Sequence, residues 1–482
     1  MNKIALQAVV ELFERYKGAK PSSVHHLPPS ASERKYFRLN VENDSILGAW
    51  NPCIQENEAF FSFTYQFLNK DLPVPPIYAI SDDRKAYLLR DLGNVTLFSH
   101  LQELRKSMSW NEQLTEIYRQ TLDALIRFQL AGKGFDFSKA YPRGCFDEQS
   151  ILWDLQYFKY YFLKLAGIFF DEQALETDFR SFAEFLTQAP SGYFMYRDFQ
   201  SRNVMLHDDT LYFIDYQGGR EGPCSYDLAS LLYDAKADIP HPIREILLRY
   251  YIEQMKQADS LDPEEFLSYW PGFVYIRILQ ALGTYGYRGF FQQKTHFLLS
   301  IPYALNNLSY VLENYGFAKQ MPELERVVRV IANDQTFRSF GKQTQRLLVQ
   351  IVSFSYRKGI PLDSSGNGGG FVFDCRALPN PGIYQQFSKF TGNHTEVIEF
   401  FDKFPEIKEF IQNCTALIQQ SIHSYLEKGY TQLLVCFGCT GGQHRSVYCA
   451  NALAEKISAS NDYDVVLTHR ELSFDKAIFM DE

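Results

Sequence analysis

The spacing of hydrophobic and polar residues changes along the chain, and its first part is strand-like. Apolar and polar positions alternate over residues 36–41 and again over 45–47, which predicts two strands joined by a tight turn. Residues 86–89 predict a further strand, and residues 56–68 repeat aromatic side chains at helical spacing. Up to about residue 95 we therefore expect a small β-rich lobe with one helix.

The middle part is dominated by long amphipathic helices. Apolar residues recur at helical spacing from about residue 96 to 335, and short apolar runs at 204–206 and 212–214 predict two strands. We expect a mostly helical lobe that carries these two strands.

The last part alternates strands and helices. Residues 348–354, 371–374 and 433–437 predict strands, residues 364–370 form a Gly-rich loop, and residues 447–457 predict a helix. Such alternation is typical of a small α/β domain.

These changes predict three regions, at residues 1–95, 96–335 and 346–482. No Gly/Ser-rich or Pro-rich stretch separates the second region from the third, so the join is expected to be stiff or packed. A length of 482 residues agrees with about three compact units.

The composition is that of an ordinary folded protein. Hydrophobic residues make up 46% and charged residues 22% of the sequence. The 48 Lys and Arg residues against 57 Asp and Glu give a net charge of −9, which disfavours a general nucleic-acid-binding surface. No apolar run approaches the roughly 18 residues of a membrane span. Eight cysteines in a long chain with no secretory signal predict reduced thiols, and we expect a cytoplasmic protein with no membrane contact.

A first cluster of reactive residue types lies in the helical region. Arg197 and Asp198 are followed by Asn203, and a short strand then ends in Asp215. This is the spacing of a kinase catalytic loop and its metal-binding carboxylate. It predicts that Asp198 is the catalytic base for an acceptor hydroxyl, while Asn203 and Asp215 hold magnesium on the nucleotide phosphates. The alternative is a polar turn between two strands that has no chemistry.

Residues 196–203, 214–217 and 225–232 resemble the aminoglycoside-phosphotransferase family of small-molecule kinases, and most closely its kinases of the anomeric hydroxyl of N-acetylmuramate and N-acetylglucosamine. The likeness covers about residues 1–330. It implies an α+β, protein-kinase-like fold of two lobes, with ATP or GTP as phosphate donor and magnesium as cofactor. It also implies nucleotide contacts at the lobe hinge from Arg90, Asp91 and Leu92, and support of the catalytic loop from Arg197, Arg202 and Asp227.

The sequence departs from that family's pattern in two places. Tyr196 occupies the position of the His that usually opens the catalytic loop. The strand at 46–50 has no Lys, and the turn at 28–32 reads Pro-Pro-Ser-Ala-Ser instead of a Gly-rich loop. We therefore expect a cation of the neighbouring strand, Arg34, Lys35 or Arg38, to bind the nucleotide phosphates. Its carboxylate partner on the helix is expected to be Glu58. A degenerate, inactive kinase is the alternative.

A second cluster follows an apolar strand in the last region. It consists of Thr440, Gly441, Gly442, His444 and Arg445, placed just before a helix. Glycines let successive backbone N–H groups converge, and a helix N-terminus with an Arg adds positive charge, so the segment predicts a phosphate cradle. The alternatives are an ordinary Gly-rich turn, a thiol-phosphatase loop read from Cys439-x5-Arg445, and a C-x-x-C pair of Cys436 with Cys439.

Residues 351–361, 373–381 and 438–447 look like the C-terminal domain of the RNase adapter protein RapZ, over about residues 347–474. In that family this domain recognises glucosamine 6-phosphate and contributes to self-association and small-RNA binding. The resemblance implies that the cradle takes the phosphate, that Asp374 and Arg376 line the same site, and that copies of the chain associate through this domain.

RNA binding is the part of this resemblance that the sequence supports least. From residue 346 onward, 12 Lys and Arg face 15 Asp and Glu, a net charge of 12 − 15 = −3. The P-loop NTPase domain of that family is absent, because the sequence has no G-x4-G-K-[ST] motif. Nucleic-acid backbones require a basic stripe, so we expect no RNA partner.

The two resemblances converge on bacterial amino-sugar metabolism. We expect a kinase that transfers the γ-phosphate of a nucleotide to a sugar hydroxyl, the anomeric hydroxyl of an N-acetylated amino sugar in cell-wall recycling. Acceptor specificity is expected from helices at 145–170 and 265–290, with Asp154 and Arg277 as candidates. The last domain would bind a sugar phosphate as an effector of the kinase. The competing hypothesis is a non-catalytic sensor that binds nucleotide and sugar phosphate and signals to a protein or RNA partner.

Overall fold

The computed structural model of the protein describes most of the chain. The described residues are 2–28, 33–41, 44–105, 110–317, 320–340, 346–361, 363, 369–428, 430–457 and 462–472. The turns expected at 28–32 and 42–44 and the Gly-rich loop expected at 364–370 lie partly outside them.

The chain forms two compact units, and each is described by itself. The first comprises residues 1–284 with 303–334, and the second comprises residues 285–302 with 335–482. The first unit contains a β-rich part followed by a helical part, and the second is an α/β domain.

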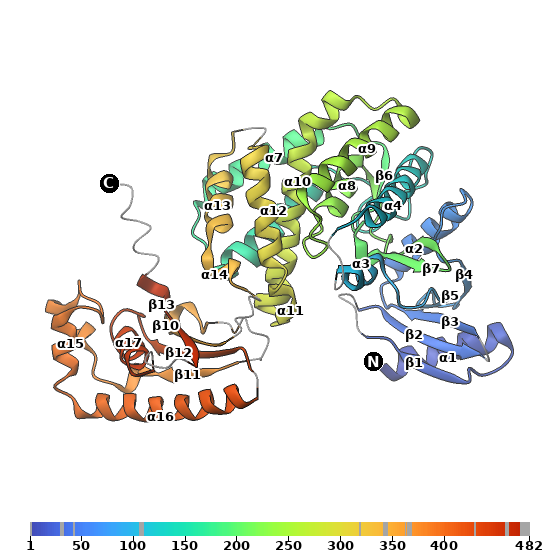
Figure 1. The fold of residues 1–482 in the computed structure, drawn as a ribbon. Coiled ribbons are helices and arrows are strands. Elements are labelled where there is room, and N and C mark those ends of the chain that lie inside the picture. The colour runs from blue at the N-terminus through green and yellow to red at the C-terminus, as the bar shows by residue number, and fades with distance from the viewer. Residues whose placement is uncertain are drawn as a thin grey trace. The chain divides into compact units, whose positions relative to one another are not determined.

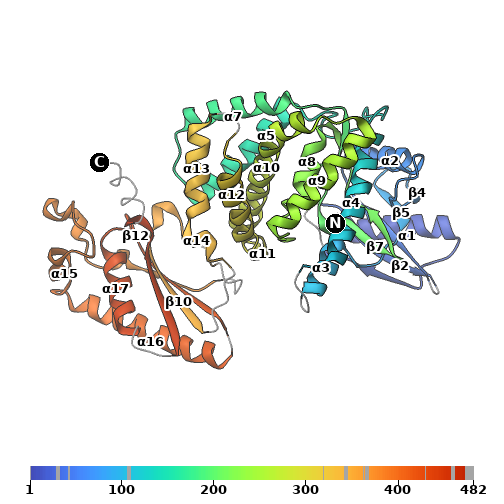
Figure 2. The same ribbon diagram turned by 45° about the horizontal axis from the view of Figure 1, so that its top comes forward.

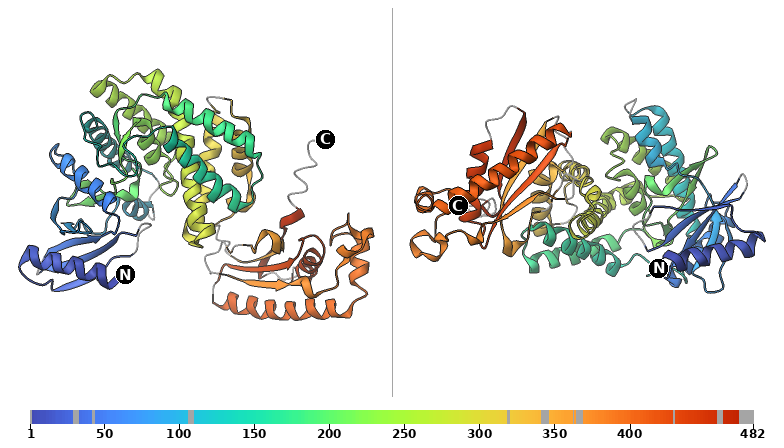
Figure 3. Two further views of the ribbon diagram at one scale, coloured as in Figure 1. Left: turned by 180° about the vertical axis from the view of Figure 1, so that it is seen from behind. Right: turned by 90° about the horizontal axis from the view of Figure 1, so that it is seen from below.

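The first unit begins with a five-stranded antiparallel sheet in the order β1-β2-β3-β5-β4. The elements of this part are α1 Asn2–Lys17, β1 Ser23–His26, β2 Lys35–Val41, β3 Asp44–Trp50, α2 Ile54–Leu68, β4 Ile77–Ile80 and β5 Ala86–Arg90. Helix α1 lies along one face of the sheet (Figures 1 and 3), where Val9 shares a buried core with Phe37 and Leu39 of β2. A Cβ atom at Gly48 would lie 2.2 Å from Val9 Cγ1, so a glycine in β3 is what lets α1 approach this closely.

The opposite face of the sheet positions the candidate site. Successive residues of a strand point to opposite faces, so Tyr36 and Arg38 lie on the face away from α1. Ala49 of β3 is paired with Tyr36 on one side and with Tyr87 of β5 on the other. Helix α2 covers this face, because the rings of Phe60 and Tyr87 have their centroids 5.2 Å apart.

The rest of the first unit is mostly helical (Figure 2). Its helices are α3 Leu97–Arg105, α4 Glu112–Ala131, α5 Glu148–Phe158, α6 Lys164–Ala166, α7 Glu172–Thr187, α8 Cys224–Leu232, α9 His241–Asp259, α10 Pro263–Tyr285, α12 Ile301–Asn314 and α13 Pro322–Asn333. Its strands form two antiparallel pairs, β6 Tyr193–Met195 with β9 Arg220–Gly222 and β7 Val204–His207 with β8 Thr210–Phe213. The α+β, kinase-like fold class predicted from the sequence is confirmed.

The second unit is built on a parallel sheet in the order β11-β12-β10-β13. Its elements are α11 Thr295–Leu298, α14 Gln335–Arg338, β10 Leu347–Ser355, β11 Phe371–Asp374, α15 Thr395–Phe401, α16 Pro405–Glu427, β12 Gln432–Cys439, α17 Arg445–Ile457 and β13 Tyr463–His469. Helices α16 and α17 share one core with β10 and β12, which includes Ile418, Val435 and Ala450. Cys436, the next residue of β12, packs with Phe354 in a smaller cluster on the other face. The predicted α/β domain is confirmed.

Residues 285–302 belong to the second unit, whereas the sequence pattern groups them with the helical lobe. Gly289 lies against Leu298, and the rings of Phe290 and Phe337 have their centroids 6.2 Å apart. A run of helical periodicity does not reveal such a change of packing partner, because the pattern is helical on both sides.

Candidate active site

The catalytic loop lies between β6 and β7, and hydrogen bonds to its backbone fix its course. The fully buried carboxylate of Asp227 on α8 accepts the backbone N–H groups of Tyr196 and Arg197, the second at 2.9 Å. Arg197 has a φ of 78°, a left-handed conformation that costs a non-glycine residue about 1–3 kcal/mol. Asp227 therefore holds the loop in a conformation that the isolated segment would avoid.

Tyr196 connects the catalytic loop to the strand end that carries Asp215. Its hydroxyl donates to the backbone oxygen of Ile214 at 2.6 Å. Its buried ring lies edge-on to Tyr216, with the centroids 6.0 Å apart. The residue that replaces the usual His thus makes a direct link between the two chain segments of the site.

Asp198, Asn203 and Asp215 are brought together by this loop. The Asn203 amide donates through Nδ2 to the backbone oxygen of Asp198 at 2.8 Å and to Asp215 Oδ2 at 3.4 Å. Asn203 is buried, whereas the Asp198 side chain is 50% exposed and Asp215 is exposed. The two carboxylates are accessible to a ligand, while the amide between them is held in place.

The oxygen atoms of this arrangement suit magnesium. Asn203 uses its NH2 group within the loop, so its Oδ1 atom remains for a metal ion. The exposed Asp215 carboxylate accepts from Asn203 and, at 2.8 Å, from Gln217 Nε2, and an ionised carboxylate has further lone pairs for a metal ion. Magnesium prefers oxygen ligands and is usually held by one or two protein groups together with substrate phosphates and water. Within the described part of the chain, no group of three His, Cys, Asp or Glu side chains could hold a metal. The Asn203–Asp215 pair matches the number and kind of protein ligands that magnesium usually has.

Aromatic rings link the catalytic loop to the β-rich part. Tyr216 stacks on Phe60 of α2 with centroids 5.2 Å apart, and its hydroxyl lies 2.6 Å from Thr64 Oγ1. Phe60 also contacts Tyr87 of β5, and Tyr196 completes the series on the other side. These buried rings form a continuous column, and each aromatic contact contributes about 0.5–1.5 kcal/mol beyond burial. No spacing in the sequence identifies this column, because its members come from four separate segments.

Arg34, which lies just before β2, forms a buried ion pair with helix α2. Its guanidinium donates to Glu56 Oε1 of α2 at 2.8 Å, and its side chain is only 2% exposed. Burial acts to lower the pKa of Arg34, but surrounding groups that include Glu56 and Asp215 raise it above its ordinary value. The Arg34–Glu56 ion pair thus joins the sheet to α2, as a Lys–Glu pair does in kinases.

The helix partner predicted from the sequence, Glu58, is wrong. Glu58 binds Arg84, with an Nη2–Oε2 distance of 2.9 Å, in a partly exposed pair. Glu56 and Glu58 are two positions apart and therefore about 200° apart around a helix, so only one can face the sheet. Lys35 is also separate from this pair, because its Nζ lies 5.6 Å from the centre of the Trp50 ring.

The hinge residues have side chains that are engaged within the protein. Asp91 accepts two hydrogen bonds from the Arg38 guanidinium, one of them at 2.9 Å. Burial alone would raise the pKa of Asp91, but Arg38 and other donors bring it below its usual value. Arg90 donates to the Tyr212 hydroxyl at 2.8 Å, and Leu92 is buried. Arg38 therefore braces the hinge, and any nucleotide contact there is left to the backbone.

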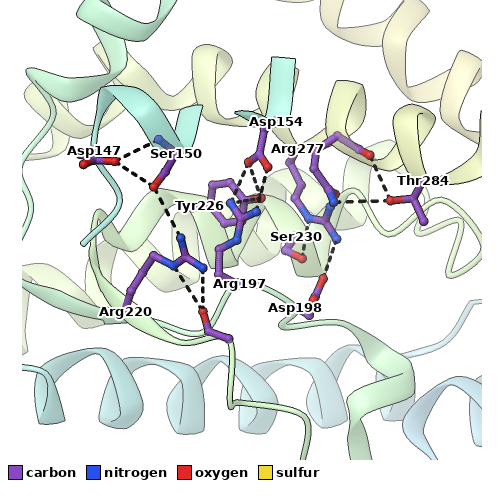
Figure 4. Close-up of polar contacts among 12 residues, drawn as sticks. Asp147, Ser150, Asp154, Arg197, Asp198, Arg220, Tyr226, Ser230, Arg277 and Thr284 are labelled. Carbon is purple, nitrogen blue, oxygen red and sulfur yellow. Dashed lines mark hydrogen bonds and ion pairs between the residues drawn. The ribbon is translucent and has the colours of Figure 1, made fainter. Parts of the chain in front are cut away.

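Arg197 supports the loop through a buried ion pair with α5 (Figure 4). Its two terminal nitrogens donate to the Asp154 carboxylate at 2.7 and 2.8 Å, and Nη1 also donates to the Tyr226 hydroxyl at 3.0 Å. Arg202 does not provide the support predicted for it. It is exposed, and it makes no hydrogen bond or ion pair with any residue that the structure describes.

Asp227 gives the first unit a pH-dependent stability. Burial raises the pKa of its carboxyl to about 7, although the backbone N–H groups of Tyr196 and Arg197 act in the opposite direction. Between about pH 4 and pH 7 the folded state keeps a proton that the unfolded chain releases, so this contribution to stability is lost as pH rises, by up to about 1.4 kcal/mol per pH unit. We expect Asp227→Asn, which resembles the protonated form, to remove this slope from urea titrations.

Tryptophan fluorescence isolates the first unit in that measurement, because all four Trp residues of the chain lie in it. Asp123→Asn, at a carboxylate that bonds the Tyr250 hydroxyl at the surface, is the matched control and should keep the slope of the parent protein. A slope in Asp227→Asn equal to that of the parent would contradict the assignment.

In the second unit, the predicted phosphate cradle is a sharp turn from β12 into α17. Gly442 has a φ of 74°, and a Cβ atom there would lie 2.3 Å from Glu471 Cγ, so both conformation and space require glycine. Its backbone N–H donates to Cys439 Sγ at 3.2 Å. Thr440 and Gly441 are exposed. The turn is held from inside by the thiol, and its outer residues face solvent.

Arg445, the predicted phosphate fork, is directed toward the neighbouring turn. It is 6% exposed, and its Nη1 donates to the backbone oxygens of Arg376 at 2.8 Å and of Leu378 at 3.2 Å. His444 is partly buried, with Nε2 3.1 Å from the backbone oxygen of Phe387. Arg445 therefore secures the neighbouring turn, and its Nη1 is not available to grip a phosphate.

Asp374 and Arg376 lie beside the cradle, as predicted, but they bind one another. Arg376 Nη2 is 2.6 Å from Asp374 Oδ2, and this arginine holds the pKa of Asp374 below its usual value. The Arg376 guanidinium also lies over the Tyr356 ring, 4.2 Å from its centre. Both side chains are exposed, so a ligand anion could exchange for the Asp374 carboxylate at Arg376.

The cysteine-based alternatives fit the geometry less well. Cys436 and Cys439 belong to buried clusters on opposite faces of the sheet, so they do not form a C-x-x-C site. Cys439 is 3% exposed, and its Sγ lies 3.1 Å from Ser446 Oγ. Reactive cysteines are partly exposed, which this thiol is not.

Family models match two separate parts of the chain. Residues 30–262 match the model described as "Phosphotransferase enzyme family", and residues 347–473 match the model of the RapZ C-terminal domain. These matches confirm the resemblance of the first part of the chain to the phosphotransferase family and of the last part to the RapZ C-terminal domain. No helix among the described residues has the length and apolar composition needed to cross a bilayer.

Curated relatives match over a limited stretch. A protein named "Nucleotide-binding protein" from Thermoanaerobacter sp. (strain X514) is 42% identical over 132 residues, which is 27% of this chain and 44% of that protein. A protein of the same name from Moorella thermoacetica is 42% identical over 139 residues, 29% of this chain and 44% of that protein. The chain thus spans less than half the length of these relatives.

Solved structures show only distant similarity. A thermostable mutant of the aminoglycoside phosphotransferase APH(4)-Ia is 14% identical with a TM-score of 0.39, over 68% of this chain and 100% of that one. A choline/ethanolamine kinase family protein from Mesorhizobium loti is 12% identical with a TM-score of 0.43, over 69% of this chain and 100% of that one.

Proposed function

We propose that the chain is an amino-sugar kinase, because residues 30–262 match the phosphotransferase enzyme family and residues 347–473 match the RapZ C-terminal domain. The donor is ATP or GTP with magnesium. The acceptor group is a hydroxyl, and the resemblance noted in the sequence favours the anomeric hydroxyl of an N-acetylated hexosamine. The second unit binds a sugar phosphate, for which glucosamine 6-phosphate is the candidate.

One observation carries the proposal for the first unit, namely the arrangement of Asp198, Asn203 and Asp215. The Asn203 amide donates to the backbone oxygen of Asp198 at 2.8 Å and to the Asp215 carboxylate at 3.4 Å, on a loop that Asp227 and Tyr196 hold in place. A degenerate kinase would have no reason to keep both the reactive side chains and this support. The arrangement therefore favours a catalyst over an inert nucleotide-binding domain.

The residues divide the reaction between them. An Asp198 carboxylate oxygen takes the proton of the acceptor hydroxyl. At the same time the hydroxyl oxygen of the acceptor attacks the γ-phosphorus, and the bond between that phosphorus and the β,γ-bridging oxygen breaks. Asn203 Oδ1 and Asp215 would hold magnesium, which neutralises charge on the phosphates. Arg34, kept charged beside Glu56, supplies a cation from the sheet side. Phosphoryl transfer depends mainly on such positioning and electrostatics.

The experiment that tests this proposal measures nucleoside diphosphate release with ATP or GTP across a panel of acceptors. The panel contains N-acetylglucosamine, N-acetylmuramate, glucosamine, glucose, choline and an aminoglycoside, each with and without magnesium. We expect turnover with an N-acetylated hexosamine only when magnesium is present, and a phosphorylated anomeric position in the product by NMR. Nucleotide binding without turnover of any acceptor would favour the sensor hypothesis.

We expect Arg34→Met to lower kcat/KM for the nucleotide by about a hundredfold, because a fixed cation beside the phosphates would be lost. Arg34→Lys should recover most of this loss, since the charge returns. The measurement is the initial rate against nucleotide concentration, with circular dichroism to show that the variants fold.

Arg84→Met is the matched control. Arg84 also pairs with a glutamate of α2, Glu58, but this pair is partly exposed. Arg84→Met should change kcat/KM by no more than about twofold, as expected for an exposed pair. Equal losses in Arg34→Met and Arg84→Met would show that Arg34 acts through general destabilisation.

The sugar-phosphate site of the second unit is supported by the cradle and by exposed Arg376. We expect the whole protein to bind glucosamine 6-phosphate in calorimetry, and Arg376→Ala to weaken binding by about tenfold or more, because a charge-assisted hydrogen bond is lost. Lys403→Ala, at an exposed lysine of the same unit, should have no effect. Equal binding by the parent and Arg376→Ala would remove Arg376 from the site. Self-association through this unit is a further expectation, testable by light scattering.

A further inference from the structure

Two largely buried guanidinium groups, one within the catalytic loop and one beside it, have their charges balanced differently (Figure 4). Arg197 is neutralised by the two-fold ion pair with Asp154. Arg277 of α10 is 4% exposed, and within the described part of the chain the carboxylate in ion-pair range of it is that of Asp198. The positive charge of Arg277 is therefore directed at the catalytic base itself.

Arg277 is held rigidly in this position. Its Nε donates to Ser230 Oγ at 2.8 Å, its Nη1 donates to Gln280 Oε1, and its Nη2 lies 3.6 Å from Asp198 Oδ1. The Tyr226 ring, whose centre is 6.0 Å from the guanidinium, packs on the same group. Because Ser230 lies on α8 with Asp227, the cation and the catalytic loop share one support.

Arg277 also begins a polar row on α10. Gln280 and Thr284 follow at spacings of three and four residues, which places the three side chains on one face of the helix. The Gln280 amide nitrogen lies 3.5 Å from Thr284 Oγ1, and both side chains are partly exposed. A guanidinium, an amide and a hydroxyl in a row can donate to and accept from the hydroxyl groups of a polyol. The row begins at Arg277, beside Asp198, the base that would activate the reacting hydroxyl.

We propose that Arg277 determines acceptor specificity by charge: it admits acceptors that are neutral or acidic next to the reacting hydroxyl and rejects those that carry an ammonium group there. This inference rests on the proposed kinase function and names the acceptor class of that site. A hexose whose amine is acylated, or replaced by a hydroxyl, fits the class, and the corresponding free amino sugar does not.

The physical reason is the balance of charge around Asp198. Without Arg277, the accessible carboxylates of Asp198 and Asp215 would attract an acceptor ammonium group. The guanidinium cancels the charge of Asp198, and an acceptor cation beside it would meet a like charge in a partly desolvated site. Like charges brought together in this way discriminate strongly between ligands.

The test compares acceptors that differ at one position of the ring. N-acetylglucosamine, glucose and glucosamine carry an amide, a hydroxyl and an ammonium group at the same carbon near neutral pH. The quantity measured is the ratio of kcat/KM for N-acetylglucosamine to kcat/KM for glucosamine, with glucose as the neutral reference. We expect Arg277→Met to lower this ratio by about tenfold or more, because the repulsion is removed. Arg277→Lys, which restores the charge, should keep the ratio within about threefold of the parent.

A pH series on the parent protein tests the same inference without any substitution. Raising the pH from about 6.5 to about 9 deprotonates the acceptor amine, so glucosamine should gain on glucose across this range. In Arg277→Met the gain should be smaller. The pH series on the parent protein tests the role of Arg277 even where Arg277→Met has too little activity to compare.

The outcomes are separable. A specificity ratio that stays the same in Arg277→Met, together with no pH-dependent gain for glucosamine in the parent, would overturn the inference while leaving the kinase intact. Absence of both turnover and calorimetric binding for every acceptor in the parent would instead overturn the proposed function, and this inference with it.

Discussion

Asp198→Asn is expected to lower kcat by about 10²- to 10⁴-fold with the acceptor that the panel identifies, because an amide oxygen does not accept the proton of the attacking hydroxyl. The substitution keeps the size of the side chain and leaves an oxygen to face Arg277 Nη2, which lies 3.6 Å from Asp198 Oδ1. Nucleotide affinity, measured by calorimetry, should change little, since Asp198 is not among the groups assigned to magnesium or phosphate.

The control for this prediction is Asp208→Asn. Asp208 is exposed in the turn between β7 and β8, close in sequence to the site but outside it, and its loss should change kcat by no more than about twofold. A decrease of less than about tenfold in Asp198→Asn would mean that positioning alone drives the transfer and that Asp198 is not the base.

The grouping of Asp198, Asn203 and Asp215 could be predicted from the sequence because the segments that carry them are close in the chain. Asp198 and Asn203 belong to one short loop, and the β7–β8 hairpin brings Asp215 back to it. The spacing of these residues therefore constrains their geometry directly. The structure also explains why Tyr196 can stand where His is usual, because its longer side chain reaches the backbone oxygen of Ile214 at 2.6 Å.

The contacts between the β-sheet and helix α2 could not be predicted in the same way, because they join segments that are far apart in the sequence. Three cations, Arg34, Lys35 and Arg38, lie on β2 or directly before it, and the alternation of side chains puts Arg34 and Arg38 on the same face. Which of them meets α2 depends on how the helix is rotated on the sheet. That rotation selects Glu56 for Arg34 and leaves Glu58 to Arg84, and no local pattern encodes it.

The second unit shows a further limit of the sequence. Its glycines and helix start predicted the turn correctly, because φ at Gly442 and the space around it are local constraints. The direction of a long side chain is not local. Arg445 donates to the backbone oxygens of residues 376 and 378. These residues follow β11, far from Arg445 in the sequence, and only the folded chain brings them close to it.

Breaking the ion pair between Arg197 and Asp154 from one side should cost the first unit more stability than breaking a surface pair. Both side chains are largely buried, at 18% and 8% exposed, and both hydrogen bonds are short. Asp154→Ala leaves the Arg197 cation without its carboxylate, and it also leaves Arg220 with a like charge nearby. Burial, and then Arg197, already lower the pKa of Arg220 to about 10, whereas Asp154 acts to raise it.

We therefore expect Asp154→Ala to lower the free energy of unfolding by about 3–5 kcal/mol, the cost of breaking a buried pair from one side. The measurement is urea unfolding followed by Trp fluorescence, which reports on the first unit alone. Replacing both partners, as Asp154→Leu with Arg197→Met, should recover much of the loss, because no isolated charge remains buried. Glu112→Ala removes an exposed partner of Arg119 and should cost no more than about 0.5 kcal/mol. If Asp154→Ala cost as little as Glu112→Ala, the pair would have to be solvated in solution, and the catalytic loop would depend on Asp227 for its support.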